Sequence, residues 1–259
     1  DHDDTLTPNA LYEVAKAINA DPCNDVIYSD EDKLDMDGGA LFEPHFKPDF
    51  DPDLLTSTNY ICHLFAVNRD LVEEVGQFDE RFDGAQDYDF IFRCTEKARK
   101  IYHIPKVLYH WRCHQGSTAS NPESKLYAFE AGARAIKAHF DRLGIETESI
   151  EKGVDYGKYH VRFAIHGEPL VSVIIPNKDH TADLDVCVRS LMEKATYKNL
   201  EYIIIENNST EPATFEYYEK LQRDHENVKV VTWEREFNYS AINNFGVKYA
   251  AGDYFLFLN

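Results

Sequence analysis

The second part of the chain alternates short apolar runs with segments of helical periodicity. Such apolar runs are typical of strands buried on both faces, and the segments between them are long enough for helices. This alternation predicts a parallel sheet with helices on its faces, whose ligands bind beyond the carboxyl ends of the strands. The runs are residues 171–175, 202–205, 228–232 and 254–258, and the helical segments are residues 184–195, 214–224 and 240–251.

The first part of the chain has a less regular pattern, which predicts a mixture of helices and strands. Thr7 and Pro8 have the character of an N-cap followed by a proline at the first helical position, so we expect a helix to begin there. Pro105 separates two strand-like segments, and residues 36–59, rich in Pro, Asp and Gly, predict a long ordered loop. The other expected elements are strands at residues 25–29, 60–68, 101–104, 107–111 and 159–165, and helices at residues 71–75, 87–98 and 123–143.

The composition supports a folded core and narrows the class of partner. Hydrophobic residues make up 43% and aromatic residues 13% of the 259 residues, which argues against an intrinsically disordered chain. A net charge of -19 argues against a surface for nucleic acid or for an anionic membrane. A nucleotide ligand stays compatible with this charge, because a divalent cation can bridge carboxylates and phosphates.

The cysteines and the hydropathy indicate the cellular setting. The five cysteines are scattered and form no C-x-x-C pair, so neither a disulfide framework nor a zinc site is indicated. A reducing cytoplasm is therefore the expected location. Because the sequence contains no apolar run long enough to cross a membrane, we expect membrane association only through flanking segments or through the acceptor.

Three segments contain residue types that suit phosphate chemistry. The segment DHDD (1–4) offers hard oxygen ligands for Mg²⁺ or Mn²⁺ on phosphates; the alternative is a solvated acidic cap before a helix. Asp87 follows a glycine turn at a helix start, where it is a candidate general base or a simple helix cap. His110 and Arg112 share one face of a strand, where an imidazole can complete a metal shell and a guanidinium can pair with a phosphate. The alternative for His110 is a buried structural histidine.

Taken together, these segments make the chain resemble the tandem family 2 glycosyltransferases of bacterial cell-surface polysaccharide synthesis, of the O-antigen and rhamnose-polymer type. The resemblance covers nearly the whole chain, and its motifs are long and ordered. The segments that carry it are DHDD (1–4), YSDEDK (28–33), PHFKPDF (44–50), STNYI (57–61), GAQDYDF (84–90), HIPKVLYHWR (103–112), GSTA (116–119), VSVIIPNKD (171–179), IIIENNS (203–209) and FNYSAINN (237–244).

The resemblance implies an α/β chain with the A-type glycosyltransferase fold, which is the Rossmann-like fold of nucleotide-diphospho-sugar transferases. By segment order, residues 1–168 would be the metal- and acceptor-binding C-terminal half of a first domain. Residues 169–259 would be the nucleotide-binding N-terminal half of a second domain. The two halves are expected to pair as a permuted composite, within one chain or by swapping in a homodimer.

The resemblance also implies an inverting, metal-dependent transfer from a UDP- or dTDP-sugar to a glycan or lipid-linked glycan. Asp1 and Asp3 fall where the family holds its metal, Mg²⁺ or Mn²⁺, and His110 falls at a third ligand. Asp87 falls at the aspartate of the family's catalytic base. The donor nucleotide would be held by Pro176, Lys178, Glu206, Asn207, Asn244 and Arg112.

Two other classes of function remain open at this point. A non-catalytic module that grips a glycan or Ca²⁺ through its acidic loops would bind Ca²⁺ without binding a nucleotide. A metal-dependent nucleotidyltransferase or phosphohydrolase would release pyrophosphate or phosphate instead of transferring a sugar. Fold alone does not choose among these, but the combination of the N-terminal aspartates with Asp87 and His110 favours the glycosyltransferase.

Overall fold

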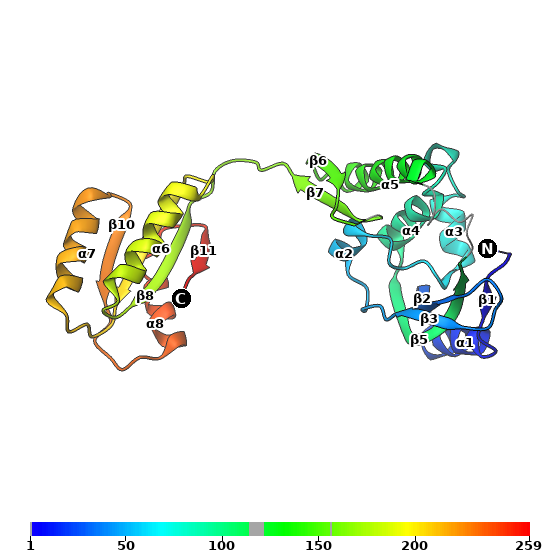
Figure 1. Cartoon of the computed structure of the whole chain (residues 1–259), viewed down its shortest axis with the longest axis horizontal. Helices are drawn as coiled ribbons and strands as arrows, with labels where there is room; N and C mark the ends of the chain where they lie inside the picture. The colour runs from blue at the N-terminus through cyan, green and yellow to red at the C-terminus, as the bar shows by residue number, and fades with distance from the viewer. Residues whose placement is uncertain (1, 114–121, 156) are drawn as a thin grey trace. The chain divides into compact units, whose positions relative to one another are not determined.

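The computed structural model describes residues 2–113, 122–155 and 157–259. The chain divides into two compact parts, unit 1 (Asp1–Ala164) and unit 2 (Ile165–Asn259), drawn in Figure 1. The division lies close to the expected boundary between residues 168 and 169. The assignment of the two units as halves of successive glycosyltransferase domains stays a prediction. Within the described residues, no helix combines the length and the apolar character that crossing a membrane requires.

Unit 2 has the strict alternation of strands and helices that its hydrophobic pattern predicts. The strands pair in parallel in the order β10-β9-β8-β11, so the predicted parallel sheet is confirmed. Its elements are β8 (Val171–Asn177), α6 (Thr181–Lys194), β9 (Leu200–Glu206), α7 (Pro212–Asp224), β10 (Val228–Thr232), α8 (Tyr239–Val247) and β11 (Tyr254–Phe257).

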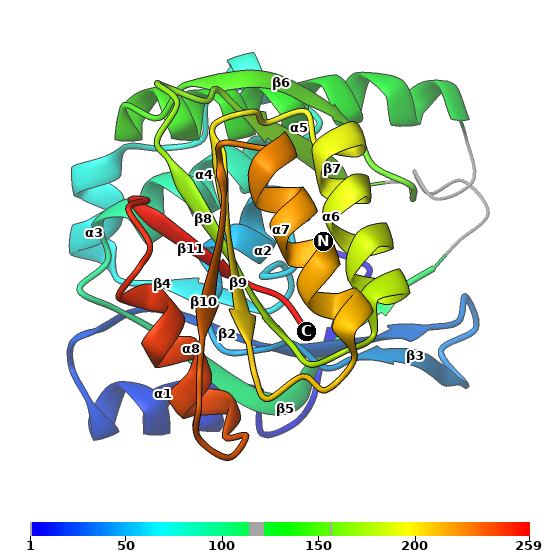
Figure 2. The same ribbon diagram turned by 90° about the vertical axis from the view of Figure 1, so that its left-hand side faces the viewer.

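The central strands β8 and β9 are covered on both faces, which explains the apolar residues along their middles, whereas the edge strand β11 is exposed along its length. Val173 on β8 packs in the cluster that contains side chains of α6 and α7, while its neighbour Ile174 packs with α8 on the other face. Figure 2 shows α6 and α7 side by side. Helix α8 lies close to the sheet, because a Cβ at Gly246 would meet the side chains of Ile205 at 2.4 Å and Ile174 at 2.9 Å.

Unit 1 is built around the long strands β2 and β5, which pair in parallel. The sheet order is β1-β5-β2-β3, with β4 also paired to β2, and β6 and β7 form a separate antiparallel ribbon. The strands are β1 (Thr5–Leu6), β2 (Asn24–Leu34), β3 (Leu41–His45), β4 (Phe65–Val67), β5 (Lys100–Arg112), β6 (Thr147–Lys152) and β7 (Tyr159–Phe163). The helices are α1 (Ala10–Ala20), α2 (Pro52–Ser57), α3 (Arg69–Val75), the 3-10 turn η1 (Glu80–Phe82), α4 (Gln86–Lys97) and α5 (Pro122–Leu143).

Several expectations for the first part of the chain are wrong, mainly because of contacts between segments distant in sequence. No helix begins at Thr7: its backbone N–H donates to Leu108 O at 3.1 Å, and α1 starts after Asn9. Residues 36–59 are not one loop, because β3 pairs with β2 and Asp51 caps α2. Strand β5 runs through Pro105, since its register against β2 shifts at that point.

Two further differences are smaller. Of the expected strand at residues 60–68, only β4 forms, and β6 was not expected at all. Strand β6 is polar along most of its length and takes its strand form from pairing with β7. The segment GSTA (116–119) lies outside the described residues.

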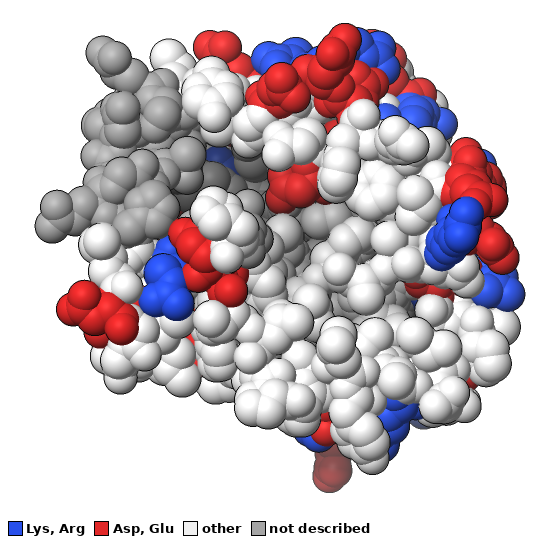
Figure 3. Space-filling model, turned by 90° about the vertical axis from the view of Figure 1, so that its right-hand side faces the viewer, with Lys and Arg blue, Asp and Glu red and all other residues white. Residues whose placement is uncertain are grey.

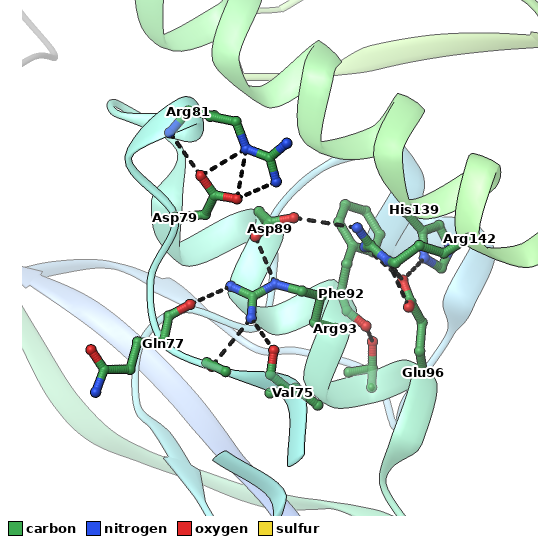
Figure 4. A network of polar contacts seen from close by, with 12 residues as sticks. Val75, Gln77, Asp79, Arg81, Asp89, Phe92, Arg93, Glu96, His139 and Arg142 are labelled. Atoms are coloured by element: carbon green, nitrogen blue, oxygen red, sulfur yellow. Dashed lines mark hydrogen bonds and ion pairs between the residues drawn. The ribbon is translucent and has the colours of Figure 1, made fainter. Parts of the chain in front are cut away.

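A network of charged side chains ties α4 to its neighbours (Figure 4). The Asp89 carboxylate on α4 is 1% exposed and accepts a hydrogen bond from Arg93 Nε at 2.8 Å. The same guanidinium donates to the backbone carbonyls of Val75 at 2.7 Å and Gln77 at 2.9 Å, which satisfies the carboxyl end of α3. These contacts fix the helix that carries Asp87 at its start.

The other side of the network ties α4 to α5. Glu96 accepts hydrogen bonds from Arg142 Nη2 at 2.7 Å and lies 2.6 Å from His139 Nδ1. Arg142 also reaches Asp89 Oδ1 at 3.5 Å. Burial opposes ionisation of Glu96, but the hydrogen bonds from His139 and Arg142 outweigh it and lower its pKa.

We predict that Asp89→Ala lowers the free energy of unfolding by about 3 kcal/mol, because it leaves the mostly buried Arg93 guanidinium without its carboxylate partner. The measurement is urea denaturation followed by circular dichroism. The matched control is Glu73→Ala, which breaks the exposed pair with Arg69 and is expected to change stability by less than about 0.5 kcal/mol. Equal effects of the two substitutions would contradict a structural role for the Asp89 network.

Candidate functional site

A cavity of about 370 Å³ opens in unit 1 beside the start of α4. Its wall combines aromatic rings with a small number of polar side chains, which is typical of a site for a sugar or another polar ligand with an apolar face. On the face of unit 1 drawn in Figure 3, charged side chains lie around the rim, most densely at the top and along the right, while the middle is hollowed and largely uncharged. The cavity is lined by Glu31, His45, Asn59, Cys62, His63, Gly84, Ala85, Asp87, Tyr88, Trp111, Tyr127, Ala128, Phe129, Gly157 and Tyr159.

Asp87 lies in the first turn of α4 and lines this cavity. The helix dipole favours a carboxylate at that end. The turn before it needs glycine: Gly84 has φ +94°, and a Cβ there would lie 2.4 Å from the Tyr127 ring. One carboxylate oxygen, Oδ2, accepts a hydrogen bond from Asn59 Nδ2 at 2.9 Å. The predicted base is therefore a half-buried carboxylate at a cavity wall.

Next to Asp87, the cavity wall contains a cluster around Glu31 on β2. Glu31 Oε2 accepts from the backbone N–H of His63 at 2.7 Å and lies 3.1 Å from His63 Nδ1, and Oε1 lies 3.4 Å from His45 Nδ1. The side chain of Lys47 is fully buried, with its ammonium 3.7 Å from Oε1. Burial opposes ionisation of Glu31, but the two histidines and Lys47 outweigh it and lower its pKa to about 2.

The N-terminal acidic segment lies against the end of β5. Strand β1 pairs with β5 so that Thr5 faces His110, and Asp4 accepts hydrogen bonds from Tyr109 Oη and from the Arg112 backbone N–H. Arg112 Nε donates to the backbone oxygen of Asp3 at 2.7 Å. The motif and the strand end are therefore neighbours in space, as a shared site requires.

These contacts bear on the predicted metal and phosphate ligands. His110 Nδ1 lies 2.5 Å from Asp32 Oδ1, and the Arg112 guanidinium donates to backbone oxygens of the Asp35–Met36 turn. Asp1 lies outside the described residues. In the part of the chain that the structure describes, no three His, Cys, Asp or Glu side chains form a group that could hold a metal ion. The assignment of Asp1, Asp3 and His110 as metal ligands stays a prediction.

In unit 2, three predicted donor-binding residues lie at the carboxyl edge of the sheet. Pro176 on β8 pairs with Ile205 of β9, and Glu206 ends β9. Glu206 is 4% exposed, and its Oε1 accepts from the backbone N–H of Ser209 at 2.5 Å. Asn207 is equally buried. These two side chains are built into the loop that follows β9.

The neighbouring loops close this edge of unit 2. Asn207 Nδ2 donates to the backbone oxygens of Trp233 at 3.1 Å and Arg235 at 3.0 Å, which joins the loops after β9 and β10. Lys178 is exposed in the loop after β8. Asn244 lies on α8 and lines a cavity of about 520 Å³ together with Trp233 and Arg235. The predicted donor residues of unit 2 thus gather at one edge of this sheet and along α8, whereas the sixth predicted donor residue, Arg112, lies at the end of β5 in unit 1.

Several residues at the Asp87 cavity, together with Lys47 behind Glu31, had no predicted role in the sequence. Asn59, Lys47 and Glu31 lie in the segments STNYI, PHFKPDF and YSDEDK, which carry the resemblance but had no role assigned. Trp111 lies between His110 and Arg112 and lines the cavity. The sequence signal for Lys47 and Glu31 is their position inside PHFKPDF and YSDEDK, two of the motifs that carry the resemblance. Only the fold shows that they meet.

Comparisons with known proteins identify the class of unit 2. Residues 172–259 match the model of the family described as Glycosyl transferase family 2. This likeness concerns unit 2, whose parallel sheet is covered by helices, and the chain as a whole is a mixed α/β structure.

Two relatives are similar over the whole chain. Uncharacterized protein y4gI of Sinorhizobium fredii is 42% identical over 100% of this chain, and O-antigen biosynthesis protein RfbC of Myxococcus xanthus is 41% identical over 99% of it. The chain spans 29% and 20% of the lengths of these two relatives. Among solved structures, the mannosyltransferase PcManGT from Pyrobaculum calidifontis in complex with GDP-Man and Mn²⁺ matches 34% of this chain and 26% of its own, with 19% identity and a TM-score of 0.30.

We predict that Glu31→Gln lowers the free energy of unfolding near neutral pH by about 3 kcal/mol. This value follows from the difference between the pKa of Glu31 in the folded protein and its pKa in the unfolded chain. The folded-state pKa of about 2 lies below the ordinary 4.5, so the unfolded chain takes up the proton first as the pH falls. The stabilisation is therefore present above pH 4.5 and lost on the way down to about 2. Urea denaturation of both proteins should show the difference narrowing over that range. A difference that does not change with pH would contradict this account.

Proposed function

We propose that this chain is part of a glycosyltransferase that moves a sugar from a nucleotide-diphospho-sugar to a hydroxyl of a growing cell-surface polysaccharide. The family 2 match over residues 172–259 supports the reaction class. The likeness of the whole chain to a protein named for O-antigen biosynthesis supports a polysaccharide as the product. The observation that carries the proposal is Asp87, a carboxylate at a helix start that opens onto a cavity of about 370 Å³.

In the proposed mechanism, Asp87 is the general base. The hydrogen bond from Asn59 occupies Oδ2, and the acceptor hydroxyl gives its proton to the carboxylate as its oxygen attacks the anomeric carbon. Attack from the face opposite the leaving nucleotide inverts the anomeric configuration. Aromatic rings such as Trp111 and Phe129 offer the sugar ring an apolar surface to pack against.

The donor is assigned to the carboxyl edge of unit 2. Pro176, Glu206 and Asn207 line the loops where ligands of parallel sheets bind, and Lys178 adds an exposed cation suited to a diphosphate. We propose a UDP- or dTDP-sugar as donor and a glycan or lipid-linked glycan as acceptor. We also propose Mg²⁺ or Mn²⁺ binding by Asp1, Asp3 and His110. Asp1 lies outside the described residues, and those that the structure describes form no three-ligand group.

The wider setting is also a proposal. A cytoplasmic location follows from the unpaired cysteines. A composite site formed by the two halves, in one chain or in a swapped homodimer, would supply both base and donor site.

We predict that Asp87→Asn lowers sugar transfer by about 10²-fold or more, because general-base assistance contributes ~10²–10⁴-fold. Binding of UDP or dTDP should stay within about twofold, since Asp87 lies outside the nucleotide site proposed in unit 2. Transfer is measured by release of UDP or dTDP and binding by calorimetry. The control is Asp83→Asn, an exposed aspartate that does not line the cavity, which should leave both unchanged. Loss of transfer and binding together would indicate a structural role for Asp87 instead.

We predict that UDP or dTDP binds at least about tenfold more tightly with Mn²⁺ than with EDTA, because the acidic chain repels an unneutralised diphosphate. Calorimetry with UDP, dTDP and GDP measures the effect and ranks the bases. His110→Ala should reduce the effect of Mn²⁺, while His160→Ala, an exposed histidine on β7, should not. Ca²⁺ binding without binding of any nucleotide would favour the non-catalytic module.

A further inference from the structure

Asn59 and Asp87 lie 28 positions apart in the sequence and meet at the wall of the unit 1 cavity. Asn59 Nδ2 donates to Asp87 Oδ2 at 2.9 Å. The opposite orientation of the amide would place its oxygen against the carboxylate, so that two acceptors would face each other. The chemistry of the pair therefore fixes the direction of this hydrogen bond.

The oxygen of the Asn59 amide lowers the stability of the fold. This oxygen, Oδ1, is buried, and the structure gives it no hydrogen-bond partner among the residues it describes. A buried acceptor without a partner destabilises a fold, and an apolar residue of similar size would avoid this. The stability of unit 1 therefore does not account for an asparagine here, whereas the N–H that it gives to Asp87 does.

The segment that carries Asn59 is anchored on both sides. Before it, the backbone N–H of Thr58 donates to Leu54 O at 3.0 Å, and Thr58 forms an isolated bridge with Lys158. After it, the buried ammonium of Lys47 donates to the backbone oxygens of Ile61, at 3.1 Å, and His63.

Glu31 holds the same segment from the other direction, because it accepts from the backbone N–H of His63. Burial lowers the pKa of Lys47, but the nearby carboxylates of Glu31 and Asp30 oppose this shift. The buried pair of Lys47 and Glu31 thus has a positional role, since it clamps the chain four residues beyond Asn59.

Two titratable side chains face Asp87, and burial keeps both protonated. Burial raises the pKa of the Cys62 thiol well above its ordinary value, and the charge of Asp87 adds to the shift. Burial likewise raises the pKa of the Tyr88 hydroxyl, with smaller contributions from Tyr159 and Asp87. Neither side chain therefore adds a charge beside Asp87 at neutral pH, and in this buried setting the N–H donor of Asn59 has a strong effect on the orientation of the carboxylate.

We infer that Asn59 is a positioning residue that holds the Asp87 carboxylate in one orientation, with Lys47 and Glu31 fixing the segment from which it acts. One oxygen is engaged by the amide, and the other is left for the acceptor hydroxyl. The inference rests on the proposed function in so far as it concerns transfer. The contact itself is testable without any sugar being transferred.

The first experiment is a double-mutant cycle in unfolding. The free energy of unfolding is measured by urea denaturation for the parent chain, Asn59→Ala, Asp87→Ala and the double variant. Because Asn59 acts on Asp87, the effect of the double substitution should differ from the sum of the single effects. Asn9→Ala combined with Asp87→Ala is the matched control and should be additive. Additivity for Asn59 and Asp87 would overturn the inference, whatever the transfer assay shows.

The second experiment measures transfer from the UDP- or dTDP-sugar whose nucleotide binds in calorimetry. Asn59→Ala should lower kcat about tenfold or more and leave the KM for the donor unchanged, because it misplaces the base and not the nucleotide. Asn59→Asp, which replaces the donor with a second carboxylate, should lower kcat further. In an Asp87→Asn background, Asn59→Ala should have no additional effect.

The outcomes separate the inference from the proposed function. If Asp87→Asn abolishes transfer but Asn59→Ala leaves kcat unchanged, the positioning role is overturned and the base assignment stands. If Asp87→Asn leaves transfer intact, the base assignment fails. In that case, or if the parent chain transfers no sugar, the unfolding cycle alone decides whether Asn59 holds the carboxylate.

Discussion

The parallel pairing of β2 with β5 is the constraint on which the rest of unit 1 depends. It places the acidic run of β2 beside the histidines of β5, so that Asp30 lies 2.8 Å from His103 and Asp32 lies 2.5 Å from His110. The same strand presents Glu31 to the cavity. A strand with three consecutive acids is unfavourable inside a protein unless each acid finds a partner, and β5 with the segments around it supplies these partners.

The chain has 46 Asp and Glu residues but only 27 Lys and Arg residues, so the carboxylates cannot all pair with separate cations. Unit 1 uses several of them in its interior: Lys47 beside Glu31, Arg93 beside Asp89, and both at positions that fix backbone carbonyls. Each of these cations therefore neutralises a carboxylate and holds a chain segment: Lys47 holds the segment of Ile61 and His63 beside the Asp87 cavity, and Arg93 holds the end of α3 against α4. The local charge balance in unit 1 matters more to the site than the net charge of the chain.

Under the proposed function, each unit would contribute one part of a transfer reaction. Unit 2 has the carboxyl edge of a parallel sheet, where Asn207 joins two loops, and its sequence matches a glycosyltransferase family model. Unit 1 has a cavity with a positioned carboxylate and aromatic rings. A sugar transferase needs a place for the nucleotide and a base for the acceptor, and each unit provides features suited to one of these needs.

The strands and helices of unit 2 could be predicted from the sequence alone, because buried parallel strands have a local pattern of apolar runs between helices. The sequence also indicated Asp87, because a glycine turn before a helix is a local signal. The contacts of Asn59 with Asp87 and of Lys47 with Glu31 depend on tertiary folding and were not predicted. The continuation of β5 through Pro105 and the start of α1 after Asn9 were not predicted either. Each of these depends on segments far apart in the chain, whose pairing has no counterpart in local periodicity.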